Sequence, residues 1–151
     1  LNLKDEKEVR NESKRLLKIQ GCEALLVQEM VKGDRELVCG LTRNEHFGPC
    51  VMFGLGGIFT EVFEDISFRM APLTFWDARE MLEEVRSKRI IGPFRGEQAV
   101  DKESLARILV ALGEIGMQYE EVEQIDLNPI KIRSNGQPVA VDALVVLKKK
   151  G

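Results

Sequence analysis

The stretch IDLNPIKIRSNGQPVAVDA, residues 125–143, contains two short apolar runs on either side of an Asn-Gly pair. An Asn-Gly pair between alternating apolar residues is a strong signal for a β-hairpin. Each run is interrupted by a polar side chain: Asn128 stands before Pro129 in the first, and Asp142 stands between Val141 and Ala143 in the second. The sequence therefore predicts a closing hairpin that carries two oxygen-bearing side chains.

Two interpretations of this pair remain open from the residues alone. Mg²⁺ binds hard oxygen ligands, and nucleotide sites supply one or two side chains while phosphate oxygens and water complete the octahedron. Alternatively, Asn128 caps the bend at Pro129 and Asp142 accepts a hydrogen bond from a backbone amide. Asp126 shares a face with Asn128 in an extended strand and is a further candidate ligand.

The register of the hairpin separates these interpretations. A two-residue turn would put Asn128 and Asp142 on opposite faces of the sheet, where they could not share an ion. A three-residue loop with Gly136 in the left-handed conformation pairs Arg133 with Gln137 and sets Asn128 beside Asp142. We predict the three-residue register, or a bulge near the Asn-Pro pair that restores it.

Two helices precede the hairpin. Thr74 is a good N-cap with Asp77 at the N3 position, and Asp101 is the N-cap of a second helix. Apolar residues follow each cap at helical spacing, namely Ala78, Met81, Leu82 and Val85 in the first and Leu105, Ile108, Leu109, Leu112 and Ile115 in the second. Each helix should bury one stripe.

The first half of the chain predicts a helix over residues 5–19 and then several strands. The apolar run 24–31, a Gly-Asp turn and the run 36–42 predict a hairpin. Residues 50–53 predict a short buried strand, and residues 66–71 alternate as a strand does. The whole chain, residues 1–151, is expected to be one α+β domain: a mostly antiparallel sheet with helices packed on one face.

The glycine-rich segment GLGGIF, residues 54–59, is a weaker signal. No Lys-Ser or Lys-Thr follows, which excludes a Walker A loop, and Phe59 stands where a dinucleotide fingerprint needs its third glycine. Closely spaced glycines after a strand let backbone N–H groups approach an anion, and they equally allow a tight turn. Both interpretations stay open for Gly54, Gly56 and Gly57.

Composition limits the classes of partner. With 22 Lys and Arg residues against 25 Asp and Glu residues, the net charge is −3, so there is no basic footprint for nucleic acid. The apolar stretches are far shorter than the roughly 20 residues that span a bilayer, so we expect no membrane partner. The three cysteines, Cys22, Cys39 and Cys50, form no C-x-x-C pair, which favours packing roles in a reducing cytoplasm.

The ordered set of motifs resembles a known family. LLVQEMVKGDRELVCG (25–40), FGLGGIF (53–59), FRG (94–96), VDKESLA (100–106), IDLNPI (125–130) and AVDA (140–143) resemble the ATP-grasp domain of the ADP-forming acetyl-CoA synthetase beta subunit. The resemblance to the succinyl-CoA synthetase beta subunit is more distant. The resemblance to the acetyl-CoA synthetase beta subunit covers residues 1–147 and implies the C-terminal subdomain of an ATP-grasp fold.

The resemblance implies an acid–CoA ligase activity. In that family, acyl-CoA, ADP and phosphate interconvert with acid, CoA and ATP through a phosphorylated histidine on a mobile segment. The implied cofactors are ATP or ADP and Mg²⁺, and the implied partner is a CoA-binding alpha subunit or domain. His46 lies in a predicted turn and is expected to be an ordinary surface residue.

The resemblance also assigns roles to residues of this chain. The backbone of Gln28, Glu29, Met30 and Val31 is expected to meet adenine, and Glu36 to reach the ribose. Asn128 and Asp142 become the expected Mg²⁺ ligands. The glycine-rich segment and Glu61 are expected near the phosphates, with Arg69 and Arg95 as further candidates. Surface ion pairing is the alternative for both arginines.

Two features of the family are absent from this sequence. The N-terminal ATP-grasp subdomain, with a phosphate-contacting lysine and a His-Lys motif, should precede Leu1, so we expect a piece of a longer chain that is inactive alone. The rival hypothesis is a non-catalytic regulatory or assembly module fused to a protein lysine acetyltransferase. Retention of Glu36, Asn128 and Asp142 favours the catalytic hypothesis.

Overall fold

The computed structural model describes residues 2–56, 65–86 and 88–149. The chain divides into two compact units, Leu1–Met30 and Val31–Gly151, and each is described by itself. In the first unit, α1 (Glu6–Leu16) begins after Asp5, whose carboxylate accepts a hydrogen bond from the Glu8 backbone N–H. The helix ends three residues before the predicted residue 19, because the chain turns there toward Gly21, which has a φ of 82°.

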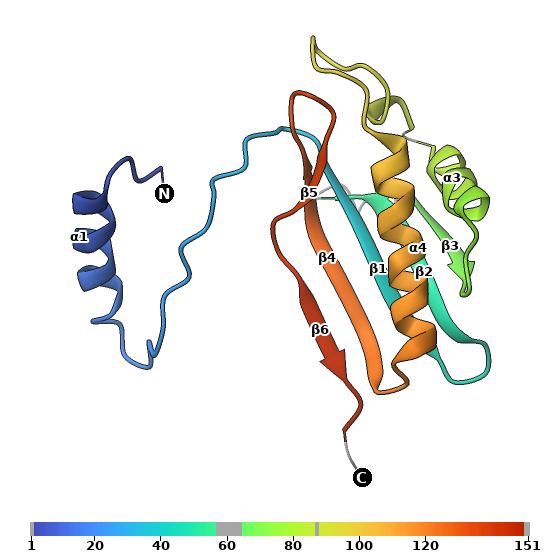
Figure 1. Cartoon of the computed structure of the whole chain (residues 1–151), viewed down its shortest axis with the longest axis horizontal. Helices are drawn as coiled ribbons and strands as arrows, with labels where there is room; N and C mark the ends of the chain where they lie inside the picture. The colour runs from blue at the N-terminus through green and yellow to red at the C-terminus, as the bar shows by residue number, and fades with distance from the viewer. Residues whose placement is uncertain (1, 57–64, 87, 150–151) are drawn as a thin grey trace. The chain divides into compact units, whose positions relative to one another are not determined.

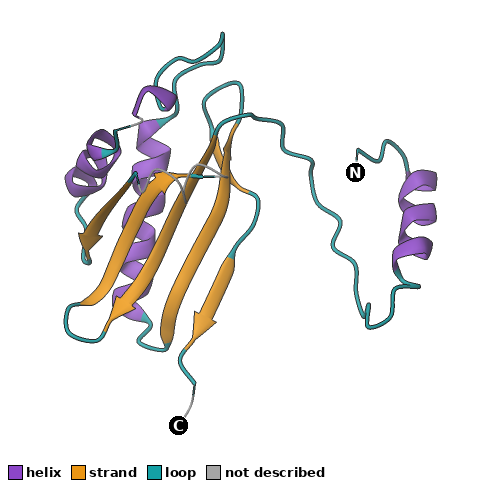
Figure 2. Cartoon of the chain, turned by 180° about the vertical axis from the view of Figure 1, so that it is seen from behind, coloured by secondary structure: helices purple, strands orange, loops and turns teal. Residues whose placement is uncertain are grey.

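In the described residues of the second unit, six strands form one antiparallel sheet (Figures 1 and 2). The strand order is β3-β2-β1-β4-β5, and β6 also pairs with β4. The strands are β1 (Glu36–Asn44), β2 (Gly48–Leu55), β3 (Ile66–Met70), β4 (Val122–Ile132), β5 (Pro138–Ala140) and β6 (Leu144–Leu147). The two longest strands, β1 and β4, therefore lie side by side in the middle of the sheet.

The predicted hairpin between residues 24–31 and 36–42 is wrong. Residues 24–31 have no regular secondary structure, and β1 pairs with β2 on one edge and with β4 on the other. Both hydrogen-bonding edges of β1 are occupied, so the preceding apolar run has no edge to join. Leu26 and Val27 are largely exposed instead.

Two helices pack on one face of the sheet, as predicted (Figure 1). They are α3 (Phe75–Glu84) and α4 (Lys102–Gln118), and the short 3-10 helix η2 (Lys88–Ile90) lies between them in sequence. Thr74 and Asp77 form the predicted capping box, and Asp101 accepts hydrogen bonds from the backbone N–H groups at the start of α4. The predicted α+β architecture is confirmed.

Side-chain alternation gives the sheet a helix face and an opposite face. On β1, Leu37, Cys39 and Leu41 are buried on the helix face, where they belong to the core with the helix residues. Glu36 and Gly40 alternate with them and therefore lie on the opposite face.

A bulge in β4 exchanges the two faces partway along that strand. Leu37 pairs with Ile130 but Cys39 pairs with Leu127, so β4 holds one more residue than β1 in this interval. The extra residue lies at Asn128 and Pro129. Ile125 and Leu127 pack into the core before the bulge, and Ile130 and Ile132 do so after it.

Candidate functional site

The hairpin adopts the predicted three-residue loop. The Arg133 backbone N–H donates to the Gln137 carbonyl at 3.0 Å, and the Gly136 N–H donates to the Arg133 carbonyl at 2.8 Å. Gly136 has a φ of 83°, the left-handed conformation that closes such a loop. The register prediction is therefore confirmed.

This register brackets the two candidate metal ligands. Ile130 pairs with Ala140 on one side of them, and Asp126 pairs with Leu144 on the other. Counting inward from either pair puts Asn128 opposite Asp142. Both residues are exposed, although residues 141–143 lie between β5 and β6 and form no ladder of their own.

Asp142 has the backbone contact that the alternative interpretation expected. Its Oδ1 accepts a hydrogen bond from the Ala143 N–H at 2.8 Å. An ionised carboxylate has about four acceptor positions, so one such bond is compatible with a metal. In the described ranges, no three His, Cys, Asp or Glu side chains gather as a metal cluster. The candidate is thus a two-ligand site made of hard oxygen donors, the kind that suits Mg²⁺.

Glu36 lies on β1 directly opposite Lys131 of β4. The Lys131 Nζ is 2.9 Å from the Glu36 Oε1, and it also donates to the Gly33 carbonyl at 3.1 Å. The predicted ribose ligand is therefore held by a cation that the sequence analysis did not single out. Glu36 and Lys131 are 95 positions apart in the sequence, so their ion pair could not be predicted before the pairing of β1 with β4 was known.

Arg35 is a second residue that the sequence analysis missed. Its side chain is only 1% exposed, and its Nε is 2.9 Å from the Glu97 Oε2. The two other guanidinium nitrogens donate to the carbonyls of Ile90, Gly92 and Gln98. This buried arginine ties the segment between η2 and α4 to the start of β1, next to Glu36.

The two described glycines of the glycine-rich segment are explained by close packing of backbones. Gly54 is part of β2 and not of a turn that follows the strand, and a Cβ there would lie 3.0 Å from the Asp65 carbonyl oxygen. A Cβ on Gly56 would lie 3.0 Å from the backbone of Glu36, whose carbonyl accepts the Gly56 N–H. Gly57 and Glu61 lie outside the described residues.

The predicted adenine segment extends across the boundary between the two units. Gln28, Glu29 and Met30 belong to the first unit, and Val31 begins the second. None of the four is in a helix or strand. Their contact with adenine stays a prediction.

Arg69 lies on β3 and forms ion pairs with Glu84 and Glu80 of α3. The hydrogen bond to Glu84 is the main cause of a raised pKa for the guanidinium. This arrangement is on the helix face, away from the face that holds Glu36, and it fits the ion-pair alternative. Arg95 lies over the ring of Phe94, with 5.2 Å between its Cζ and the ring centroid.

His46 is an exposed turn residue, as expected. Its backbone N–H donates to the Asn44 side chain at 2.8 Å. Cys39 is fully buried, and burial raises the pKa of its thiol, so its role is packing. No helix in the described ranges combines the length and the apolar character needed to cross a membrane.

Comparisons with known proteins identify the family that the chain resembles. The sequence profile of the ATP-grasp domain matches residues 1–147. The beta subunit of an ADP-forming acetate–CoA ligase from Pyrococcus furiosus is 43% identical over 123 residues, which are 82% of this chain and 53% of that protein. An ADP-forming acetate–CoA ligase from Archaeoglobus fulgidus is 43% identical over 125 residues, 83% of this chain and 18% of that protein.

Two solved structures of an acetyl-coenzyme A synthetase also resemble this chain. The apo form of the dinucleotide-forming acetyl-coenzyme A synthetase 1 of Ca. Korarchaeum cryptofilum matches with a TM-score of 0.90 and 41% identity, over 98% of this chain and 70% of that one. The same enzyme in complex with coenzyme A and Mg-AMPPCP matches with a TM-score of 0.87 and 41% identity, over 98% of this chain and 67% of that one. This chain therefore spans only part of the proteins that it resembles.

Proposed function

The chain belongs to the ATP-grasp family, and we propose that it is the part of an ADP-forming acyl-CoA synthetase that holds the nucleotide and Mg²⁺. The observation that carries the proposal is the register that sets Asn128 opposite Asp142. Asn128 lies on β4, and β4 also pairs with the strand that holds Glu36. This pairing brings Asn128 on β4 and the proposed ribose ligand Glu36 on β1 onto adjacent strands, with Asp142 in the segment that follows β5. The names of the relatives favour this ligase role over a regulatory module.

In this proposal each residue has one task. The oxygens of Asn128 and Asp142 hold Mg²⁺, which when bound offsets the negative charge of the nucleotide phosphates. Glu36 accepts hydrogen bonds from the ribose hydroxyls. The backbone of residues 28–31 meets adenine, and the glycine-rich segment after β2 lies near the phosphates.

The reaction needs more protein than these residues supply. Phosphoryl transfer requires positioned charge on several sides of the phosphate. We infer that a preceding ATP-grasp subdomain and a CoA-binding subunit or domain provide the rest, and that phosphate passes through a histidine on a mobile segment.

The first experiment measures turnover of the full-length protein together with its CoA-binding partner. Acetyl-CoA, ADP and phosphate should yield ATP, acetate and CoA in the presence of Mg²⁺. Absence of ATP formation with acetyl-CoA and with a panel of other short acyl-CoA substrates would refute the ligase proposal.

The second experiment tests the metal ligands by calorimetric titration with ADP, with and without Mg²⁺. Asp142→Ala should weaken binding of the Mg²⁺ complex by about tenfold or more, which corresponds to about 1.4 kcal/mol, and should leave metal-free ADP binding unchanged. The matched control is Glu123→Ala, since Glu123 is also an exposed acid but lies near the start of β4, away from Asn128 and Asp142. Equal affinities for Asp142→Ala and the parent chain would contradict the metal assignment.

A further inference from the structure

We propose that Lys131 is a positioning residue that makes Glu36 selective for the ribose hydroxyls of the nucleotide. The inference rests on the proposed nucleotide site and adds a residue to it. Lys131 would not touch the nucleotide itself. It acts by fixing the carboxylate of Glu36 and by neutralising its charge.

The geometry gives the Lys131 ammonium group two anchors. One is the Glu36 Oε1 at 2.9 Å, and the other is the Gly33 carbonyl at 3.1 Å. The Lys131 side chain is 26% exposed and that of Glu36 is 32% exposed, so both are partly withdrawn from water. The β4 backbone fixes one end of the Lys131 side chain and the Gly33 carbonyl fixes the other, so few rotamers are left and the ammonium group holds the Glu36 carboxylate in one position.

Gly33 makes this anchor rigid. A Cβ at this position would lie 2.3 Å from the Ile132 carbonyl oxygen, so the backbone before β1 is packed directly on β4. The Ile132 N–H in turn donates to the Arg35 carbonyl at 3.1 Å. The Gly33 carbonyl that receives Lys131 is therefore held by the same strand that carries Lys131.

The β4 bulge explains why a lysine at this position reaches Glu36. Before the bulge the odd-numbered residues Ile125 and Leu127 point toward the helices. Without an extra residue, Lys131 would continue that series and enter the core. The bulge shifts the alternation by one, so Ile130 is buried and Lys131 lies beside Glu36 on the opposite face.

The pair has the chemistry needed to recognise a vicinal diol. An ionised carboxylate only accepts hydrogen bonds, and its two oxygens offer about four acceptor positions. Lys131 uses one of these on Oε1. The remaining positions suit two adjacent hydroxyl donors, and the ammonium charge reduces repulsion between Glu36 and the anionic phosphates.

The test compares ADP with 2′,3′-dideoxy-ADP, both with Mg²⁺, by calorimetric titration of the full-length protein. The parent protein should bind ADP about tenfold more tightly, as expected for a lost hydrogen bond to a charged group. Glu36→Gln and Lys131→Met should both reduce this ratio toward one, mainly by weakening ADP binding. Lys131→Arg keeps the cation and should retain most of the preference.

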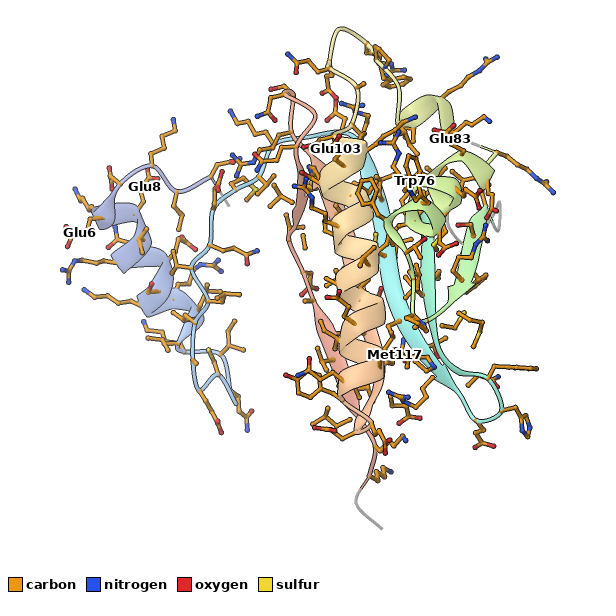
Figure 3. The ribbon with its side chains drawn as sticks, turned by 45° about the vertical axis from the view of Figure 1, so that its right-hand side comes forward. Glu6, Glu8, Trp76, Glu83, Glu103 and Met117 are labelled. Carbon is orange, nitrogen blue, oxygen red and sulfur yellow. The ribbon has the colours of Figure 1, made fainter. Side chains whose placement is uncertain are left out.

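A matched control distinguishes positioning from a general loss of charge or stability. Lys102 forms a comparable ion pair with Glu83, which lies on α3 in the helix layer (Figure 3). Lys102→Met should leave the ratio at the parental value. Thermal melts of each variant check that the fold is intact.

Three results would overturn the inference. Lys131→Met could weaken ADP and dideoxy-ADP equally, which would reveal a purely structural ion pair. It could also leave both affinities unchanged, which would remove Lys131 from ribose recognition while nucleotide binding stands. If the parent protein binds neither nucleotide, the proposed function fails and this inference fails with it.

Discussion

Replacing Arg35 by Met should lower the free energy of unfolding by about 3 kcal/mol. The guanidinium is buried, and methionine would fill much of its space while removing every donor. The carbonyls of Ile90, Gly92 and Gln98 and the carboxylate of Glu97 would each lose a partner. Removal of one partner from a buried ion pair costs about 3 to 5 kcal/mol.

The lower end of that range applies because Glu97 is 25% exposed and can recover hydration. With a urea dependence of about 1 to 3 kcal/mol per molar, the unfolding midpoint should fall by about 1 to 3 M. Circular dichroism is the better probe, because the single tryptophan, Trp76, is 76% exposed and its emission would change little (Figure 3).

The control is Arg107→Met, which removes a surface ion pair with Glu103 at 3.5 Å. Exposed pairs of this kind contribute little, so its midpoint should stay near that of the parent. Glu97→Gln should have an intermediate effect, because the amide oxygen can still accept from Arg35. If the midpoint of Arg35→Met matches that of Arg107→Met, the buried network does not stabilise the fold as argued.

Three further outcomes are expected. Gly136→Ala should destabilise by about 2 to 4 kcal/mol in urea titrations, because its Cβ would lie 2.0 Å from a carbonyl oxygen of the segment before α4; Gly21→Ala, equally left-handed but in open space, should cost about 1 kcal/mol. The hydrogen bond from the Ser104 hydroxyl is the main cause of a lowered pKa for Asp101. A depressed pKa contributes stability that is present above the unfolded value of about 4 and is lost as the pH falls through the folded value, so Asp101→Asn should reduce the fall of the urea midpoint as the pH is lowered below about 4. Burial raises the pKa of the Cys39 thiol, so mass spectrometry should find Cys39 alkylated by iodoacetamide at a pH of about 8 only after unfolding; modification of the native chain would contradict its packing role.

Features that depend on neighbouring residues could be predicted from the sequence. The caps at Thr74 and Asp101 use groups two or three residues away, and both were predicted correctly. The three-residue loop that ends at Gly136 is equally local. These signals depend on backbone sterics and on donors that any helix or turn must satisfy, so they hold whatever surrounds them.

Strand partners could not be predicted in the same way. The run 24–31 is apolar, and apolarity indicates that a segment needs cover without indicating what covers it. The hairpin prediction assumed the nearest apolar run as the partner, whereas the β4 residues that pair with β1 follow it by 82 to 95 positions. Arg35 was missed for a related reason, since its partners at Ile90, Gly92, Glu97 and Gln98 follow it by 55 to 63 residues.

The bulge at Asn128 and Pro129 shows how such long-range pairing determines the chemistry. Strict alternation from Leu127 would expose Ile130 and bury Lys131, and burying the ammonium of Lys131 in the core would be far more costly than inserting one unpaired residue. The extra residue lets both isoleucines after it enter the core and leaves Lys131 beside Glu36. The extra residue of β4 lies at Asn128 and Pro129, so Asn128, one of the two proposed metal ligands, is also part of the bulge that turns Lys131 away from the core. A variant that deletes Pro129 should therefore disturb the proposed metal and ribose sites together.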